Sequence, residues 1–462
     1  MGGGPSINYC VPVTQPAEGE SPVFRFPDFK DKLIDHLPAY GKTLKEVMIH
    51  SGKAFGHLPA IGRIVKKGEA NDIEFVNYKQ AIEFGHQIGS AIVSDGLFNI
   101  PEGEKMKMFG IFSKNKPEWT YTDIGACLFG LTTIPIYDTL GDENITYVFK
   151  HTQITTCFVN DGALKALTKC HDMVNVKNLV CYDAINEDLR GFFNERGVNL
   201  IAYEDLLQKG RDNLIDYNKE EFKVSPEDCI TFSYTSGTTG PPKGAMVSHR
   251  NFTSFIAGVK LNKDTKFCSD DVAISYLPLP HILEREFVYS LLAVGARVVF
   301  YSGDVQKLKD DLAIVKPTIF VSVPRLFSRF HDVLKARFKE VTGFTKTALD
   351  YALGVKLSNL EKSGKCTHSV YDRIFFAKTK DALGGRVRLM ISGSAPLLPE
   401  VQNFLKVCMC APLIEGYGQT ESTGAMTITD ADDPVVRHVG GPTVHLQLFR
   451  PTSKSNWWIF RK

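Results

Sequence analysis

The residues best suited to chemistry lie near the middle of the chain, in Tyr234–Gly244, which has the sequence YTSGTTGPPKG. Its glycines let backbone N–H groups approach a ligand closely, its hydroxyls donate further hydrogen bonds, and Lys243 adds a positive charge. No Asp or Glu occurs from residue 229 to residue 263, so the local field favours an anion. The segment therefore predicts a phosphate-binding turn, in which the expected contacts are Thr235, Ser236, Gly237, Thr238, Thr239, Gly240 and Lys243.

Two elements flank this turn and would position it. Cys229–Tyr234 alternates apolar and polar side chains as a strand does, and Ser248 is suited to cap a helix that carries Phe255 and Val259 on one face. The spacing does not give the Gly-Lys-Ser/Thr of a Walker loop, which disfavours a P-loop kinase or GTPase. The alternative interpretation is a mobile Gly/Thr surface loop.

Segments on both sides of the turn alternate between strand-like and helix-like patterns. Strands that alternate with helices at such lengths predict a doubly wound α/β fold. Residues 326–384 predict a long, mostly helical insert, and residues 1–40 an irregular N-terminal segment. The expected strands are 107–112, 132–137, 155–159, 180–182, 272–277, 297–301, 318–323 and 386–392, and the expected helices of the α/β layer are 78–94, 122–131 and 145–150.

Composition disfavours several classes of protein. With 462 residues, 43% of them hydrophobic, the chain is expected to form two or three subdomains. The formal net charge of +2 argues against binding to nucleic acid or another polyanion. The ten cysteines contain no C-x-x-C pair, which disfavours a disulfide scaffold or zinc site and favours a reduced, cytosol-facing compartment. No apolar run reaches the roughly 18 residues of a membrane span.

The first six residues, MGGGPS, fit the pattern for N-myristoylation of Gly2, and Cys10 could take a second lipid. A single myristoyl chain anchors a protein only reversibly. Such a protein would associate peripherally with the endoplasmic reticulum or another organelle membrane from its cytosolic side. The alternative is a flexible glycine-rich terminus without a lipid.

Two later segments, together with the turn, resemble the adenylate-forming superfamily of acyl-CoA synthetases, luciferases and peptide-synthetase adenylation domains. YTSGTTGPPKG resembles its phosphate-binding signature, and GSAP (393–396) and EGYGQTE (415–421) resemble its adenine-binding segments. The resemblance implies that Tyr417 stacks on adenine, Thr420 touches the α-phosphate and Glu421 holds Mg²⁺, for which one carboxylate suffices beside phosphate oxygens and water. The implied nucleotide contacts in these two segments are Gly393, Ser394, Ala395, Pro396, Glu415, Gly416, Tyr417 and Gly418.

His281 lies in PLPHILERE (278–286), which resembles the segment where the superfamily places an acyl-site histidine or aromatic residue. His281 is therefore expected to line the carboxylate pocket, and the alternative is a packed loop residue. The adjacent Glu284 and Arg285 are expected to form a structural ion pair. Lys243, Thr420, Glu421 and His281 are thus the expected catalytic residues.

Three features resemble the eukaryotic long-chain acyl-CoA synthetases in particular: GIFSKNKPEW (110–119) followed by PIYDTLG (135–141), the PLPHILERE string, and the helical insert. The implied reaction joins a long-chain fatty acid to CoA. The fatty carboxylate attacks the α-phosphate of ATP, giving acyl-adenylate and pyrophosphate, and the CoA thiol then displaces AMP. The implied ligands are ATP, Mg²⁺ and CoA, and an aromatic acid is the alternative substrate.

The resemblance covers residues from about 45 to about 442. Residues 41–443 are expected to form the large AMP-binding domain, and residues 444–462 match no segment of the family. The superfamily's small C-terminal domain, with its adenylation lysine, is not found in this sequence, so activity is expected to be impaired. The alternative class is a non-catalytic nucleotide- or acyl-binding protein, or one that interferes with a longer relative.

Overall fold

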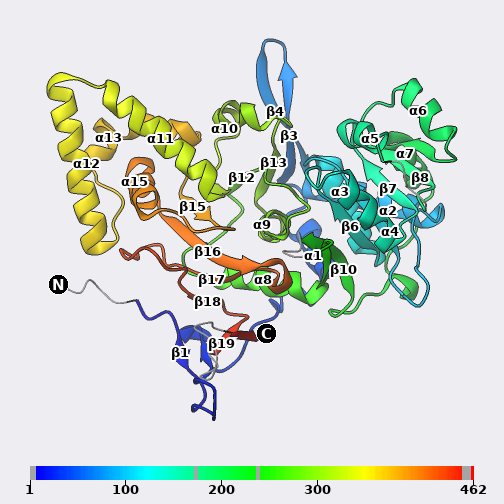
Figure 1. Cartoon of the computed structure of the whole chain (residues 1–462), viewed down its shortest axis with the longest axis horizontal. Helices are drawn as coiled ribbons and strands as arrows, with labels where there is room; N and C mark the ends of the chain where they lie inside the picture. The colour runs from blue at the N-terminus through cyan, green and yellow to red at the C-terminus, as the bar shows by residue number, and fades with distance from the viewer. Residues whose placement is uncertain (1–6, 171–174, 236–239, 450–458, 462) are drawn as a thin grey trace.

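A computed structural model describes residues 7–170, 175–235, 240–449 and 459–461. Within these residues the strands form four sheets, with helices packed around three of them (Figure 1). The largest sheet has the strand order β11-β10-β6-β5-β7-β8-β9. Its strands are β5 (Met108–Phe112), β6 (Thr132–Ile136), β7 (Thr156–Val159), β8 (Asn178–Cys181), β9 (Asn199–Ala202), β10 (Cys229–Thr235) and β11 (Lys243–Ser248).

The chain winds this sheet in two directions from β5. β5 pairs in parallel with β6 on one side and with β7 on the other, so successive crossovers run in opposite directions. Every residue of β5, β6 and β7 is buried, as expected where helices cover both faces. The prediction of a doubly wound α/β fold is confirmed. The helices of this part are α1 (Leu44–Ala54), α2 (Tyr78–Ser94), α3 (Pro117–Phe129), α4 (Asp142–Thr152), α5 (Asp161–Leu167), α6 (Glu187–Asn194) and α7 (Tyr203–Asp212).

Two further sheets lie beside the first. One has the order β12-β13-β3-β4 and ends in the protruding β3–β4 hairpin, and the other has the order β14-β15-β16-β17-β18 (Figure 1). Their strands are β3 (Pro59–Lys67), β4 (Ala70–Asn77), β12 (Val272–Ser275), β13 (Arg297–Phe300), β14 (Ile319–Ser322), β15 (Leu389–Ser392), β16 (Leu413–Gln419), β17 (Gly424–Ile428) and β18 (Gly441–Pro442). The accompanying helices are α8 (His249–Leu261), α9 (Ile282–Leu292), α10 (Leu308–Val315) and α15 (Pro399–Met409).

A helical stretch separates β14 from β15 and forms one edge of the molecule (Figure 1). α11 (Pro324–Glu340) and α12 (Gly343–Ser363) follow one another across a short turn, and the short helices α13 (Tyr371–Ile374) and α14 (Ala377–Lys380) return the chain to the sheet. α11 and α12 both pack against α15. The stretch therefore rests on the five-stranded sheet through α15 and through α11, whose Phe327 and Phe330 pack against Phe320 of β14.

The two ends of the described chain meet in a small fourth sheet. β2 (Phe24–Arg25) pairs with β1 (Val11–Pro12) and with β19 (Gln447–Phe449), and β19 pairs with β20 (Ile459–Arg461). Arg25 Nε donates to Gln447 Oε1 at 3.1 Å. A search of the described residues finds no helix with the length and hydropathy needed to cross a bilayer.

Candidate active site

The predicted phosphate turn closes a β-hairpin. β10 and β11 pair antiparallel, and Thr235 opposite Lys243 is the last pair before the turn. Lys243 and Gly240 are exposed, and within the described residues Lys243 forms no ion pair. Ser236, Gly237, Thr238 and Thr239 lie outside the described residues. The hairpin therefore carries Thr235 and a solvent-exposed ammonium group at the base of the turn.

The other predicted residues follow the carboxyl ends of parallel strands. His281 follows β12, Gly393 follows β15, and Thr420 follows β16. β14, β15 and β16 are parallel, so their carboxyl ends meet at one edge, where open α/β sheets bind ligands. The fold thus brings segments that are far apart in the sequence to one edge of the sheets.

The last residues of β16 differ in their relation to a cavity. Gly416 and Gly418 line a cavity, whereas Tyr417 is 37% exposed and its hydroxyl accepts a hydrogen bond from Gln419 Nε2 at 3.0 Å. The pairing of β16 with β17 is irregular between Tyr417 and Gly418, and Tyr417 is not among the residues that line the cavity. A Cβ at Gly418 would lie 1.8 Å from the backbone oxygen of Gly424, so only glycine fits there.

The GSAP segment is held in place by Glu415. Gly393 and Ser394 line the cavity, and Ser394 adopts a positive φ of 71°. Ala395 and Pro396 are exposed and do not line it. The buried Glu415 carboxylate accepts a hydrogen bond from the backbone N–H of Leu397 at 3.1 Å, and burial raises the pKa of this carboxyl group. Glu415 therefore fixes the loop that follows β15, and it is not one of the residues that line the cavity.

Thr420 and Glu421 begin a short 3-10 helix, η5 (Thr420–Ser422), which lies beside β11. Thr420 lines the cavity, and the Glu421 side chain is exposed. Glu421 has no ion-pair partner in the part of the chain that the structure describes. Because β11 begins at Lys243, the short helix η5 lies next to the phosphate hairpin.

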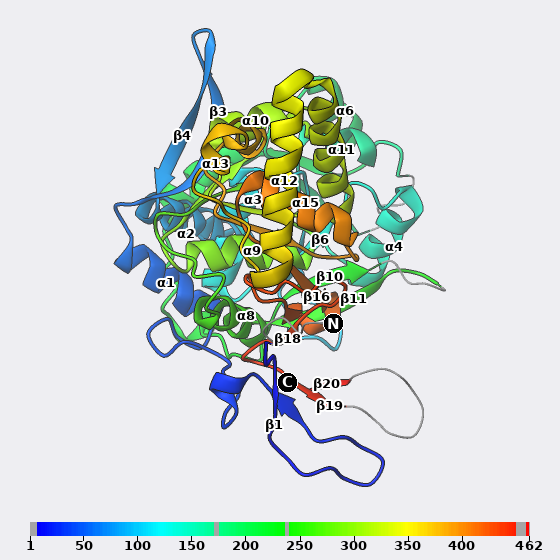
Figure 2. The ribbon, with the colours of Figure 1, turned by 90° about the vertical axis from the view of Figure 1, so that its left-hand side faces the viewer.

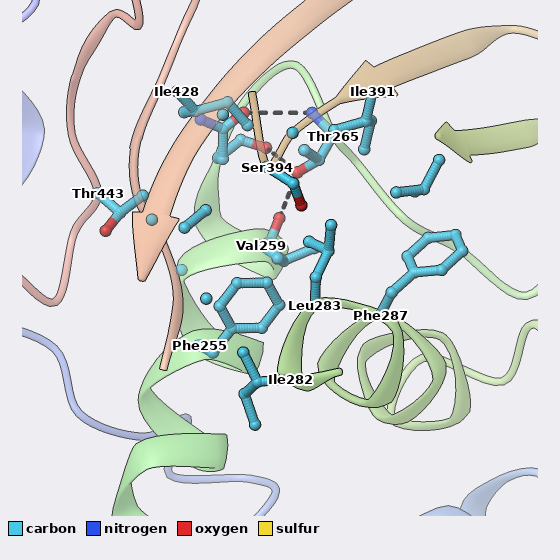
Figure 3. Close-up of a pocket in the computed structure, with 18 of the residues that line it drawn as sticks. Phe255, Val259, Thr265, Ile282, Leu283, Phe287, Ile391, Ser394, Ile428 and Thr443 are labelled. Carbon is cyan, nitrogen blue, oxygen red and sulfur yellow. Dashed lines mark hydrogen bonds between the residues drawn. The ribbon is translucent and has the colours of Figure 1, made fainter. Parts of the chain in front are cut away.

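The cavity itself has a volume of about 210 Å³ and lies between α8, α9 and the strands β15–β17 (Figure 3). The side chains labelled in Figure 3 are mostly apolar and include residues of α8, α9, β15 and β17. α8 begins at the predicted cap, since Ser248 Oγ accepts from the backbone N–H of Asn251. At the other end of α8, the Thr265 hydroxyl donates to the Val259 carbonyl at 2.5 Å. The apolar lining consists of Phe255, Val259, Phe267, Ile282, Leu283, Phe287, Val321, Ile391, Ala425 and Ile428.

His281 brings a polar group to this apolar wall. It caps α9, and its Nδ1 accepts a hydrogen bond from the backbone N–H of Leu283 at 3.2 Å. Burial lowers the pKa of His281, so the ring is neutral near pH 7. Because Nδ1 is an acceptor, the neutral ring carries its hydrogen on Nε2. His281 thus supplies an uncharged N–H donor at the cavity.

The sequence did not predict several residues of the cavity wall, among them Gly258, Gly424, Thr443 and His445. A Cβ at Gly258 would lie 2.8 Å from Nδ1 of His445, so the glycine lets this ring pack against α8. A glycine in the middle of a helix lowers helix stability, and for that reason indicates a close contact. The mid-helix glycine could be seen in the sequence, but it did not indicate that His445 is the residue packed against it.

One expectation was wrong: Glu284 and Arg285 do not pair. Arg285 is 2% exposed and forms its ion pair with Asp123, which is fully buried. Its Nη1 also donates to Thr231 Oγ1 at 2.6 Å, and the Tyr289 hydroxyl donates to Asp123 Oδ2 at 2.6 Å. Adjacent residues on a helix point in different directions and rarely pair. Glu284 is buried separately, and burial raises the pKa of its carboxyl group to about 8.

A model of the AMP-binding enzyme family matches residues 71–449. The chain belongs to this family, as its motifs predicted. It is similar to long chain acyl-CoA synthetase 6, peroxisomal, of Arabidopsis thaliana, with 36% identity over 424 residues that cover 91% of this chain and 59% of the relative. It is also similar to long-chain-fatty-acid–CoA ligase 1 of Homo sapiens, with 36% identity over 376 residues, 80% of this chain and 52% of that protein. The chain therefore spans between half and three fifths of the length of these relatives.

Solved structures share the fold at low sequence identity. The adenylation domain of a carboxylate reductase from Mycobacterium chelonae matches with a TM-score of 0.66 and 20% identity, over 85% of this chain and 60% of that one. A long-chain-fatty-acid-CoA ligase from Archaeoglobus fulgidus matches with a TM-score of 0.59 and 17% identity, over 91% of this chain and 77% of that one. These matches confirm the predicted fold of the large domain.

Proposed function

We propose that the chain carries the adenylation site of an ATP-dependent, AMP-forming ligase that activates a long-chain fatty acid for transfer to CoA. The observation that carries the proposal is the apolar cavity that has Thr420, Gly393 and His281 in its wall and the Lys243 hairpin beside it. Long-chain acyl-CoA synthetases among the relatives support the same substrate class.

In this proposal the hairpin binds the triphosphate. Lys243 offsets the negative charge, and Thr235, Ser236, Gly237, Thr238, Thr239 and Gly240 supply hydroxyl and backbone donors. The carboxylate oxygen attacks the α-phosphorus, a new P–O bond forms, and pyrophosphate leaves with the electrons of the broken P–O bond. The nucleophile is already ionised, so the residues align it and stabilise charge without acting as a base.

Glu421 fits Mg²⁺, because its exposed carboxylate has no ion-pair partner within the described residues and Mg²⁺ sites combine one or two carboxylates with substrate phosphates. A bound Mg²⁺ would offset charge on the phosphate oxygens. Thr420 would donate its hydroxyl to the α-phosphate. His281 would donate from Nε2 to the fatty carboxylate while its neutral ring keeps the cavity free of a second charge.

The exposure of Tyr417 and the place of Gly416 and Gly418 in the cavity wall support a division of the substrates. Tyr417 would stack on adenine, Ala395, Pro396 and Glu415 would contribute further nucleotide contacts, and Gly416 and Gly418 would leave room for the acyl group in the cavity. Burying an acyl chain gains about 0.8 kcal/mol per CH₂. An apolar cavity therefore favours a fatty acid over a small polar acid.

The proposal is tested by ATP–pyrophosphate exchange with palmitate, ATP and Mg²⁺, with benzoate as the competing aromatic acid and thioester formation with CoA measured in parallel. We expect exchange that depends on palmitate and Mg²⁺. Lys243→Ala should lower it about a hundredfold, as removal of a charge-stabilising donor typically does. Lys219→Ala, at an exposed lysine that belongs neither to the hairpin nor to the cavity lining, is the control. Absence of exchange in the wild-type chain, or equal exchange in both variants, would contradict the proposal.

N-terminal lipidation stays a prediction, because Gly2 lies outside the described residues. We propose that a myristoyl group on Gly2, if added in a eukaryotic host, would give reversible attachment to an organelle membrane from the cytosolic side. The intact mass of protein made in such a host decides the point, since an unmodified terminus removes this route to a membrane.

A further inference from the structure

The helical stretch between β14 and β15 presents an outer face that no other described element covers. In Figure 2, α12 faces the viewer, with α11 and α13 on either side of it. α12 buries Leu349, Ala352 and Leu360 at helical spacing and packs against α15. On the exposed side of α12, Phe344 and Tyr351 are seven residues apart, about two helical turns, and are 87% and 67% exposed.

Exposed apolar side chains are concentrated on this stretch. Val333 on α11 is 46% exposed, and Val370 and Ile374, at α13, are 50% and 64% exposed. Together with Phe344 and Tyr351 they make five of the fourteen large exposed hydrophobic residues found among the described residues. Concentrated exposed apolar side chains mark an interaction surface more often than scattered ones do.

The same stretch is strongly basic. Residues 324–386 contain thirteen Lys and Arg against six Asp and Glu, a net charge of +7, whereas the whole chain has a net charge of +2. Only Lys335, Lys346 and Lys356 of these cations form ion pairs within the described residues. Those without an ion-pair partner there are Arg325, Arg329, Arg337, Lys339, Lys362, Lys365, Arg373, Lys378, Lys380 and Arg386, and the acids without a Lys or Arg partner are Asp332, Glu340, Glu361 and Asp381.

At the turn between α11 and α12, exposed apolar and exposed cationic side chains lie close together in the sequence. Arg337 and Lys339 are exposed in the last turn of α11, and Phe344 lies in the first turn of α12. A bilayer interface accepts an aromatic ring beside cationic side chains, because the ring enters the headgroup region while the cations meet lipid phosphates. The core of a protein–protein interface, in contrast, is depleted of lysine.

We infer that the outer face of α11, α12 and α13 docks the protein on an anionic lipid bilayer, with Phe344 and Tyr351 entering the headgroup region and the unpaired cations contacting anionic lipids. This surface is separate from the cavity, whose lining includes no residue of the helical stretch. A docked chain would lie at the lipid bilayer, which is where long-chain fatty acids are most concentrated.

Cosedimentation with vesicles tests the inference in the absence of ATP and fatty acid, so the result does not depend on the proposed ligase activity. One set of vesicles contains phosphatidylcholine with phosphatidylserine, and the other phosphatidylcholine alone. We expect the wild-type chain to bind only the anionic vesicles and to lose binding as salt is raised. Arg337→Glu/Lys339→Glu should weaken binding about tenfold or more, and Phe344→Ser/Tyr351→Ser about tenfold.

Matched controls come from the segment 211–219, at the opposite end of the molecule (Figure 1). Arg211→Glu/Lys219→Glu and Leu214→Ser change exposed side chains of the same kinds and should bind like wild type. All of the altered side chains are exposed, so the unfolding temperature should stay unchanged and report that each variant is folded.

Three results would overturn the inference. The first is equal binding to neutral and anionic vesicles, and the second is no binding to either. The third is that the Arg337→Glu/Lys339→Glu and Phe344→Ser/Tyr351→Ser variants bind as well as the control variants. If sedimentation in solution instead shows a dimer that Phe344→Ser dissociates, the face is an interface between two copies of the chain, and the membrane assignment is wrong.

Discussion

At the scale of single residues, the protonation state of His281 follows from its place at the start of α9. Burial lowers its pKa below the ordinary value of 6.5, so between these two pKa values the unfolded chain binds a proton that the folded chain does not. Stability therefore falls as the pH drops through about 6.5, and the loss stops below the lowered pKa. The lowered pKa of His281 therefore destabilises the folded chain at acidic pH.

His281→Asn removes this dependence, because asparagine also caps helices and does not titrate. We expect the difference in free energy of unfolding between variant and wild type to move in favour of the variant as the pH falls from about 7.5 to about 5. Chemical denaturation at several pH values measures it. Burial also lowers the pKa of His249, to about 4. Because wild type and His281→Asn both contain His249, its contribution cancels in the difference between their free energies of unfolding. Parallel pH profiles would show that His281 protonates equally in both states.

The surroundings of residues in contiguous motifs could be predicted, because strand ends and turns give local sequence patterns. Lys243 follows a glycine-rich turn, and Thr420 and Glu421 follow a strand end, so sequence alone indicated their environment. His445 could not be predicted in this way. It lies beyond the last motif, and its place in the cavity wall depends on the close approach of its ring to Gly258.

At the scale of elements, the pairing of β16 with β17 depends on Gly418. A Cβ there would meet a backbone oxygen, which cannot move aside as a side chain can. Gly418→Ala should lower the free energy of unfolding by about 2 kcal/mol through this overpacking and should also reduce palmitate-dependent exchange. Thermal unfolding and the exchange assay measure the two effects. Gly191→Ala, inside α6 with no atom within 4 Å of the added Cβ, should leave exchange unchanged. Equal behaviour of the two variants would contradict this view of β16.

Elements with strong periodicity were predicted from sequence, and those without it were not. The buried strands β5, β6 and β7 are short apolar runs and were expected close to their actual bounds. The β3–β4 hairpin was missed, because several of its residues are charged or exposed and do not give the pattern of a buried strand. The net charge of the chain likewise concealed the basic helical insert, since a total carries no information about where charges lie.

At the scale of the whole molecule, the buried pair of Arg285 and Asp123 joins layers that the sequence keeps far apart. Asp123 lies on α3, Arg285 on α9, and Arg285 also donates to Thr231 on β10 and Thr133 on β6. The network therefore links α9, the helix that His281 caps, to β10, the first strand of the phosphate hairpin. Its partners could not be found from sequence, because local spacing indicates only neighbours along one helix.

Removing one member of this pair should be far more damaging than removing both. Arg285→Met leaves the Asp123 carboxylate buried without its cation, which should cost about 3–5 kcal/mol of unfolding free energy. Arg285→Met/Asp123→Leu should recover much of that loss, because two apolar side chains need no compensating charge. Denaturant titration of the single and double variants measures the difference. Lys67→Met, which breaks the exposed pair of Lys67 with Asp72, serves as the control and should change stability little. If Arg285→Met cost no more than Lys67→Met, the buried pair would not hold the layers together, and the positions of α9 and β10 would have to depend on apolar packing alone.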